Sequence, residues 1–222
     1  MIKNLLRGTA ALSFAVVALA SPASASPAVV PAAPAVSIQM PEPPQAAVAI
    51  DELRTLTVEP SHPMTGYSRA KFPHWSSQFG KCDTREVVLA RDGEDVAQDE
   101  ECRATSGTWL SLYDNKTFTS SGQLDIDHMV PLANAWRSGA DTWTTDKRKQ
   151  FANDLEHSQL IAVSAASNRS KGDQSPETWA PPSSAYWCTY GRAWTHVKSL
   201  YGLSVTEGEK AALENMLNTC EA

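Results

Sequence analysis

The feature that most constrains this fold is a set of four cysteines, all in one stretch of the chain: Cys82, Cys102, Cys188 and Cys220. An even number of cysteines in an exported chain favours disulfides, and four cysteines allow three pairings. Local spacing favours Cys82–Cys102 and Cys188–Cys220, because each pairing closes a loop of modest length. A zinc site is the alternative, but the sequence has no C-x-x-C pair. We therefore expect two disulfides.

The first 25 residues are typical of a secretory signal peptide. Lys3 and Arg7 supply positive charge, residues 10–20 form a short apolar run, and Ala23-Ser24-Ala25 offers an A-x-A cleavage site. A membrane anchor is the alternative. However, the run is too short to cross about 30 Å of hydrocarbon. We expect export, with a mature chain that starts near Ser26 and ends up outside the cell.

Residues 26–60 are rich in proline and alanine, which predicts an extended linker or pro-segment. Residues 61–222 are then long enough for one compact domain. The whole chain carries a formal net charge of −6. This charge counts mildly against a nucleic-acid binder, although a site can gather cations locally while the remaining surface stays acidic.

The pattern along this domain predicts a loop-rich α+β fold. Residues 108–119 resemble a hairpin with an Asp-Asn turn, and residues 123–131 alternate as a strand does. A buried strand over 160–163 is followed by Ser164, a good N-cap for a helix that contains Asn168. Further helices are expected, at 131–140, 146–154, 185–201, from Ser175-Pro176 and from Thr206; residues 85–91 fit either a helix or a strand.

Three polar residues in this arrangement suggest catalysis. Asp127 and His128 end the first strand, and their side chains point to opposite faces. Asp127 is a hard oxygen ligand for Mg²⁺, Mn²⁺ or Ca²⁺, whereas His128 suits proton abstraction from water. Asn168 offers a neutral amide oxygen on a helix that packs across the strands.

The sequence resembles the HNH endonucleases, whose core is the ββα-metal (His-Me finger) unit. The resemblance rests on L-x-I-D-H-M-V-P-L from Leu124, on L-I-A-V-S from Leu160 and on N-R-S-K-G-D from Asn168. It is strongest to secreted bacterial nucleases related to the C-terminal domain of the GmrSD restriction enzymes. It extends to Tyr67-Ser68-Arg69, to C-D-T-R-E from Cys82, to Trp179-x-Pro181-Pro182 and to Cys188-Thr189-Tyr190.

This resemblance implies a role for each matching residue. His128 would be the general base, and Asp127 and Asn168 would hold one divalent cation, Mg²⁺ with Mn²⁺ or Ca²⁺ as alternatives. Lys171 and Arg169 would hold the phosphate or stabilise its developing charge. Gln159 stands where the family has a bracing asparagine, on a longer arm.

Several residues keep two interpretations. Arg85, beside Asp83, either binds substrate or forms an ion pair. His157 is either a third ligand or a surface histidine. Lys147-Arg148-Lys149 either contacts a nucleic-acid backbone or is a solvated helical face. Trp136 and Trp143 either stack on bases or belong to the core.

We therefore expect a monomeric, secreted, metal-dependent endonuclease that hydrolyses DNA, with RNA as an alternative substrate, and that has little base specificity. One alternative is a non-catalytic extracellular nucleic-acid-binding domain of the same fold. The other is a different metallohydrolase, such as a cell-wall peptidase, which would need several histidines and a carboxylate in one cavity.

Overall fold

The computed structural model describes residues 40–220, which form the α+β fold expected from the sequence. The predicted signal peptide and residues 26–39 of the predicted linker lie outside the described residues. The helices are α1 (Ala46–Thr55), α2 (Thr84–Asp92), α3 (Leu132–Arg137), α4 (Thr145–Ala152), α5 (Ala165–Lys171), α6 (Trp187–Tyr201) and α7 (Glu207–Leu217). Short 3-10 turns are η1 (Arg69–Lys71), η2 (Ser121–Gln123), η3 (Ala140–Thr142) and η4 (Ser184–Tyr186).

Residues 40–60 correct the expectation of an extended linker over 26–60. They contain α1, whose Ala49 and Leu53 are buried against α6 and α7. Arg192 of α6 fixes the approach to this helix by donating hydrogen bonds to the Pro43 and Pro44 carbonyls at 2.6 and 2.7 Å. The compact domain therefore begins at least twenty residues before the predicted boundary at 61, because α1 packs on the core and the proline-rich segment supplies carbonyl acceptors to the partly buried Arg192.

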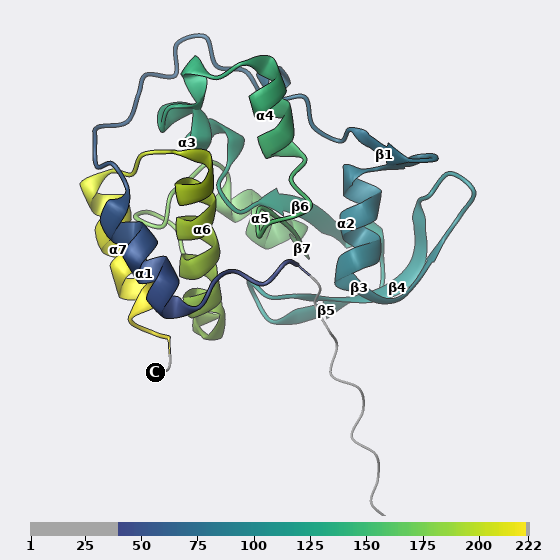
Figure 1. Ribbon diagram of the computed structural model, residues 1–222. Helices are drawn as coiled ribbons and strands as arrows, with labels where there is room; N and C mark the ends of the chain where they lie inside the picture. Colours follow the sequence, from purple (N-terminus) through teal and green to yellow (C-terminus); the bar gives the residue numbers. More distant parts are fainter. Residues whose placement is uncertain (1–39, 221–222) are drawn as a thin grey trace, which may run out of the picture. The chain divides into compact units, whose positions relative to one another are not determined.

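The centre of the domain is an antiparallel pair of strands, β6 (Leu124–His128) and β7 (Leu160–Ser164), followed directly by α5. Asp127 pairs with Ile161 and His128 with Leu160. Ser164 ends β7 and caps α5, because its hydroxyl accepts a hydrogen bond from the Ser167 N–H at 3.2 Å. Helix α5 contacts both strands and lies beside them (Figure 1), and its Asn168 reaches Asp125 of β6.

The outer edge of β7 is completed by side chains instead of a third strand. Arg91 of α2 donates to the Leu160 carbonyl at 2.5 Å, and the neighbouring Asp92 accepts from the Ala162 N–H at 2.8 Å. The Ser111 hydroxyl accepts from the Ser164 N–H at 2.9 Å. Since buried backbone groups need partners, these contacts hold a two-stranded sheet whose second strand is buried along its whole length.

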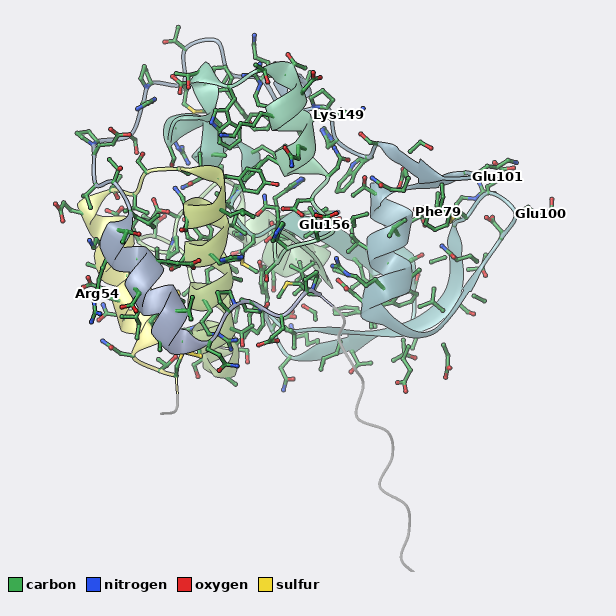
Figure 2. All side chains as sticks on the ribbon, viewed as in Figure 1. Arg54, Phe79, Glu100, Glu101, Lys149 and Glu156 are labelled. Atoms are coloured by element: carbon green, nitrogen blue, oxygen red, sulfur yellow. A yellow bond between two sulfur atoms is a disulfide. The ribbon has the colours of Figure 1, made fainter. Side chains whose placement is uncertain are left out.

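Two further hairpins form an arm on one side of the domain (Figure 1). The first pairs β1 (Ser77–Phe79) with β2 (Cys82–Asp83), and the second is part of the sheet β3 (Gly93–Gln98), β4 (Ala104–Ser111) and β5 (Lys116–Phe118), in that order. The Cys82–Cys102 disulfide joins the two hairpins. Phe79, Glu100 and Glu101 lie at the tip of this arm (Figure 2).

Helices α1, α6 and α7 form the other side of the domain and contact one another. The Cys188–Cys220 disulfide links α6 to the chain just after α7, so both pairings favoured by spacing are confirmed. Buried Trp194 of α6 donates to Glu209 of α7 at 2.6 Å. Within residues 40–220, no helix is both long and apolar enough to traverse a membrane.

One expected helix is absent from its predicted position. Ser175-Pro176 opens a single turn, in which the Ser175 carbonyl accepts from the Thr178 and Trp179 N–H groups. The chain then reaches Pro181-Pro182, and proline has no N–H to continue a helix. Residues 85–91, which fitted helix or strand equally, form α2.

Candidate active site

Asp127, His128 and Asn168 line one cavity of about 250 Å³. The first two end β6, and the third comes from the helix that follows β7. The strand pairing and the cap at Ser164 therefore bring together residues that are forty positions apart in the sequence. The remaining lining residues are Tyr67, Arg69, Ile126, Pro131, Leu132, Ala133, Arg169, Gly172 and Asp173.

His128 is held with one ring nitrogen free. Its Nε2 lies 2.9 Å from the carbonyl oxygen of Ala152. A carbonyl oxygen can only accept, so Nε2 carries the proton and Nδ1 has the lone pair. Nδ1 has no hydrogen-bond partner among residues 40–220 and is not sealed from solvent. Burial lowers the pKa of His128 to about 3, with Arg69 among the charges that reinforce the shift. The ring is therefore an unprotonated base.

Asp127 is held by two side chains beneath the cavity. Its Oδ2 accepts from the Tyr113 hydroxyl at 2.5 Å and from the Lys171 ammonium group. Its other oxygen, Oδ1, accepts no hydrogen bond from the described residues and is not sealed from solvent. Burial raises the pKa of Asp127, while Lys171 and Tyr113 oppose the rise. The ion pair thus favours a carboxylate with one oxygen facing the cavity.

The position of Lys171 corrects the expectation that it holds a substrate phosphate. Its side chain is fully buried, and its three N–H groups donate to Asp127 and to the carbonyls of His128 and Met129, the latter two at 2.9 Å. The ammonium group also lies 5.5 to 5.8 Å from the ring centres of Tyr113, Tyr190 and Trp194. All its donors are used, so Lys171 positions the end of β6 from below and does not face the cavity.

Asn168 is oriented by Asp125, a residue to which the sequence assigned no role. The Asn168 Nδ2 donates to Asp125 Oδ2 at 3.2 Å. The amide oxygen Oδ1 then has no partner among the described residues and remains accessible. Asp125 lies two positions before Asp127 on the same face of β6, so a single strand supplies one proposed ligand and the group that orients the other.

Gln159 braces the chain just after His128. Its amide spans both backbone groups of Val130, with Oε1 accepting from the Val130 N–H at 3.1 Å and Nε2 donating to its carbonyl at 3.0 Å. The Gln159 backbone carbonyl also accepts from the Met129 N–H at 2.7 Å. The longer arm of glutamine therefore makes the two bonds that a brace requires.

Two arginines, Arg69 and Arg169, line the cavity together with Asp173. Arg69 of η1 donates to His74 at 3.3 Å; burial raises the pKa of Asp127 and lowers that of His128, and the charge of Arg69 opposes the first shift and adds to the second. Arg169 is exposed and lies 3.4 Å from Asp125. Arg169 was expected at the site. Arg69 was missed as a functional residue, although the Tyr67-Ser68-Arg69 element belonged to the resemblance and was the signal that could have found it.

Arg85 does not line this cavity. Its guanidinium pairs with Glu86 at 2.8 Å and donates to the Ser121 carbonyl at 3.4 Å. The adjacent Asp83 is the N-cap of α2, accepting from the Glu86 N–H at 3.0 Å. The structure therefore brings Arg85 into an ion pair, which is one of the two interpretations left open by the sequence.

His157 lies outside the group formed by Asp127, His128 and Asn168. Its Nδ1 is 2.9 Å from Asp154, and it lines a different cavity, of about 480 Å³. Its ring also lies 6.0 Å from that of His196. His157 is thus a partly exposed histidine paired with an acid and not a third ligand beside Asp127.

The basic cluster on α4 is largely structural. Arg148 is buried and donates to the carbonyls of Lys71 and Ala140 at 2.9 and 3.3 Å. Lys147 lies over the Trp143 ring at 4.3 Å and donates to the Tyr201 carbonyl. Lys149 projects from α4 at the surface (Figure 2).

The two tryptophans near this helix belong to the core. Trp136 is buried, with its ring 5.8 Å from that of Tyr67. Trp143 packs against Phe151 and Tyr201, with ring centres 5.6 and 5.8 Å away. Both tryptophan side chains are therefore used in core packing and are not free to stack on bases.

The free oxygens of Asp127 and Asn168 suit a hard divalent cation. One carboxylate and one amide oxygen, completed by water and substrate oxygens, form a ligand set typical of Mg²⁺. Between residues 40 and 220 there is no group of three or more His, Cys, Asp or Glu side chains placed to share a metal ion. The residues at the cavity thus fit a sparsely ligated cation.

Comparison with known proteins identifies the family. Residues 84–216 match the family described as "GmrSD restriction endonucleases, C-terminal domain". The chain belongs to this family, which is of the nuclease type and implies a nucleic-acid substrate. The matched region contains β6, β7 and α5, and therefore Asp127, His128 and Asn168.

A protein of Arthroderma benhamiae is 55% identical over 196 residues, which cover 88% of this chain and 93% of that protein. It is described as an "Uncharacterized secreted protein". No solved structure matches this chain significantly.

Proposed function

We propose that this protein is a secreted, metal-dependent endonuclease in which β6, β7 and α5 form a ββα-metal core. One observation carries the proposal. His128, Asp127 and Asn168 each use one polar atom in a fixed hydrogen bond and leave one acceptor atom open beside the same cavity. Such preorganisation is expected of a catalytic site, because the acceptor atoms need no rearrangement before reaction.

His128 is the proposed general base. The bond to the Ala152 carbonyl fixes the tautomer, so Nδ1 takes a proton from the attacking water. The depressed pKa keeps Nδ1 unprotonated at neutral pH. The role of the protein at this step is to hold a neutral imidazole at the edge of the cavity.

Asp127 and Asn168 are the proposed ligands of one divalent cation, Mg²⁺ or alternatively Mn²⁺ or Ca²⁺. Such a cation would stabilise negative charge on the phosphate and on the leaving oxygen. Tyr113 and Lys171 fix the direction of the Asp127 carboxylate, and Asp125 fixes the Asn168 amide. These three are positioning residues.

Arg69 and Arg169 are the proposed phosphate-binding residues. They lie far apart in the sequence, and both line the cavity. Guanidinium groups bind phosphate oxygens well, and contacts to the phosphates of a nucleic acid carry no base information directly. We therefore propose little sequence specificity. The proposed substrate is DNA, with RNA as an alternative. We propose a monomer as the active form.

Export is proposed on three grounds: the signal-like residues 1–25, the two disulfides and the similarity to a secreted protein. N-terminal sequencing of protein collected from the medium should find a start near Ser26. A start beyond residue 60 would contradict the structure, since it would remove α1.

The test is incubation of the purified protein with supercoiled plasmid DNA and, separately, with single-stranded RNA. Cleavage should require Mg²⁺ or Mn²⁺ and stop on addition of a chelator. His128→Ala should reduce the rate by roughly 10²- to 10⁴-fold, the usual contribution of a general base.

His157→Ala is the matched control, because this histidine also pairs with a polar group but lines another cavity. It should leave the rate unchanged. Equal loss in both variants would remove the special role of His128. Retarded migration of the nucleic acid without cleavage under any metal would favour the non-catalytic binding domain.

A further inference from the structure

The turn between β4 and β5 contains a sequence motif for covalent modification. The sequence contains the N-x-S/T acceptor triplet of N-linked glycosylation at two positions, Asn115-Lys116-Thr117 and Asn168-Arg169-Ser170. The structure places them very differently. The first lies in a surface turn, and the second lies in α5 beside the candidate active site.

Asn115 and Thr117 are both exposed. Asn115 has φ 52°, in the left-handed region that asparagine tolerates better than most residues. Its side chain forms no hydrogen bond with any residue in the range 40–220. The amide nitrogen that would accept a sugar is therefore accessible and has no structural task.

The residues before Asn115 hold the turn from the inside. Tyr113 is fully buried and bonded to Asp127, and Asp114 accepts from the Ser164 hydroxyl at 2.9 Å. Within the described part of the chain, the following strand, β5, pairs with β4 alone, since the sheet order is β3-β4-β5. A bulky substituent on Asn115 would thus project from an anchored turn at the edge of a sheet without interrupting backbone pairing.

We propose that Asn115 carries an N-linked oligosaccharide when the chain passes through a secretory pathway that performs this modification. The donor is a polyprenyl-pyrophosphate-linked oligosaccharide, bound by the pathway's own transferase. A bond forms between Asn115 Nδ2 and the anomeric carbon of the first sugar. The bond from that carbon to the pyrophosphate oxygen breaks, polyprenyl pyrophosphate leaves, and the amide loses one proton to a base of the transferase. The inference rests on the export proposed above.

The second triplet must stay unmodified if Asn168 is a cation ligand. A sugar on Asn168 Nδ2 would replace one of the two hydrogens of the amide nitrogen that donates to Asp125 at 3.2 Å, and it would crowd a cavity of about 250 Å³ that Asp127 and His128 also line. Asn115 is exposed in a surface turn, whereas Asn168 is part-buried at this cavity, so a glycan is accommodated more readily at Asn115. The two positions therefore have opposite expected occupancies, which separates this inference from the proposed function.

The experiment is secretion of the full chain from a yeast host, followed by release of N-glycans with an amidase in heavy-oxygen water and peptide mass mapping. Released sites become heavy-oxygen-labelled aspartate. We expect the label at Asn115 and none at Asn168. The intact protein should show a single mobility step that the amidase removes.

Thr117→Ala and Asn115→Gly should each abolish this mobility step, and Thr117→Ser should retain it. Glycine is chosen because Asn115 has positive φ, which glutamine would tolerate poorly. Cleavage activity should be the same before and after the amidase.

A secreted chain without sugar at Asn115 overturns this inference and leaves the proposed export intact. A chain that remains in the cell without sugar at Asn115 contradicts both the inference and the proposed export. Sugar at Asn168 in a chain that cleaves DNA would instead contradict the proposed ligand.

Discussion

Lys171 and Asp127 form an ion pair beneath the candidate active site, and the lysine side chain is fully buried. Lys171 lies one helical turn after Asn168, so α5 supplies both a proposed cation ligand and the counter-charge of the other ligand. The same ammonium group donates to the backbone carbonyls of His128 and Met129. One buried lysine therefore links the helix to the strand end that carries the proposed base.

Replacement of Lys171 by methionine should destabilise the fold and the cation site together. Removing one partner of a buried ion pair leaves an uncompensated charge and costs about 3–5 kcal/mol. Urea unfolding measures this loss, and titration with Mn²⁺ measures cation affinity, which we expect to fall because Asp127 is no longer fixed.

Lys198→Met is the matched control. Lys198 is also fully buried, but it pairs with Glu209 in the helical part of the domain. It should cost similar stability and leave the affinity for Mn²⁺ unchanged in the folded protein. Unchanged affinity in Lys171→Met as well would show that this ion pair has only a structural role.

The pKa of His128 predicts how stability depends on pH. Burial lowers this pKa to about 3, whereas the unfolded value is near 6.5. Between these two pH values the unfolded chain binds one more proton at His128 than the folded chain does. The contribution of His128 to the unfolding free energy is therefore complete above pH 6.5 and is lost as the pH falls toward 3. At about 1.4 kcal/mol for each pKa unit, the total is at most roughly 5 kcal/mol.

Unfolding free energies of the wild-type protein and His128→Gln, measured from pH 4 to 7.5, should converge toward acid. The amide nitrogen of glutamine reaches about as far as histidine Nε2, so it can still donate to the Ala152 carbonyl, and it does not titrate. A constant difference between the two proteins across this range would mean that His128 is not held in its neutral form.

Asp125→Ala should weaken cation binding without much loss of stability. The hydrogen bond to Asn168 orients the amide, and a bond of this kind contributes about 0.5–1.5 kcal/mol. We expect the affinity for Mn²⁺ to fall by roughly 2- to 10-fold. Asp125→Asn is the control, because its amide oxygen can still accept from Asn168 and should preserve affinity. An equal loss in both variants would point to the charge of Asp125 instead of its hydrogen bond.

Gln159→Leu should destabilise the strand end on which His128 lies. It would leave the N–H and the carbonyl of Val130 without their partners, and each unsatisfied buried group costs about 1–3 kcal/mol. We expect a loss of at least about 2 kcal/mol in urea unfolding, with slower cleavage. Gln159→Glu, which keeps only the acceptor, should be intermediate. Stability equal to that of the wild type in Gln159→Leu would show that the brace is dispensable.

Local patterns in the sequence determined much of the site. Strand alternation separated the directions of Asp127 and His128, and the cap at Ser164 started α5 at the right residue for Asn168. Spacing was enough to choose both disulfides. These features depend on backbone geometry within a few residues or on short loops, so a single sequence contains them.

Tertiary packing decided what lies around those residues. The N-R-S-K-G-D motif places Lys171 close to Asn168, but only the packing of α5 against β6 and the aromatic rings of α6 shows that Lys171 faces the core. Likewise, Arg69 reaches the cavity from η1, far upstream in the sequence, and α1 joins a domain that composition alone would have started later.

The division between features that the sequence determines and features that tertiary packing determines has one physical cause. Helix periodicity, capping and strand alternation are set by neighbours along the chain, whereas burial of a charge and the free atom of a hydrogen-bonded side chain are set by elements distant in sequence. The sequence by itself named Asp127, His128 and Asn168. Only the folded structure showed which of their atoms are held and which remain open to the cavity.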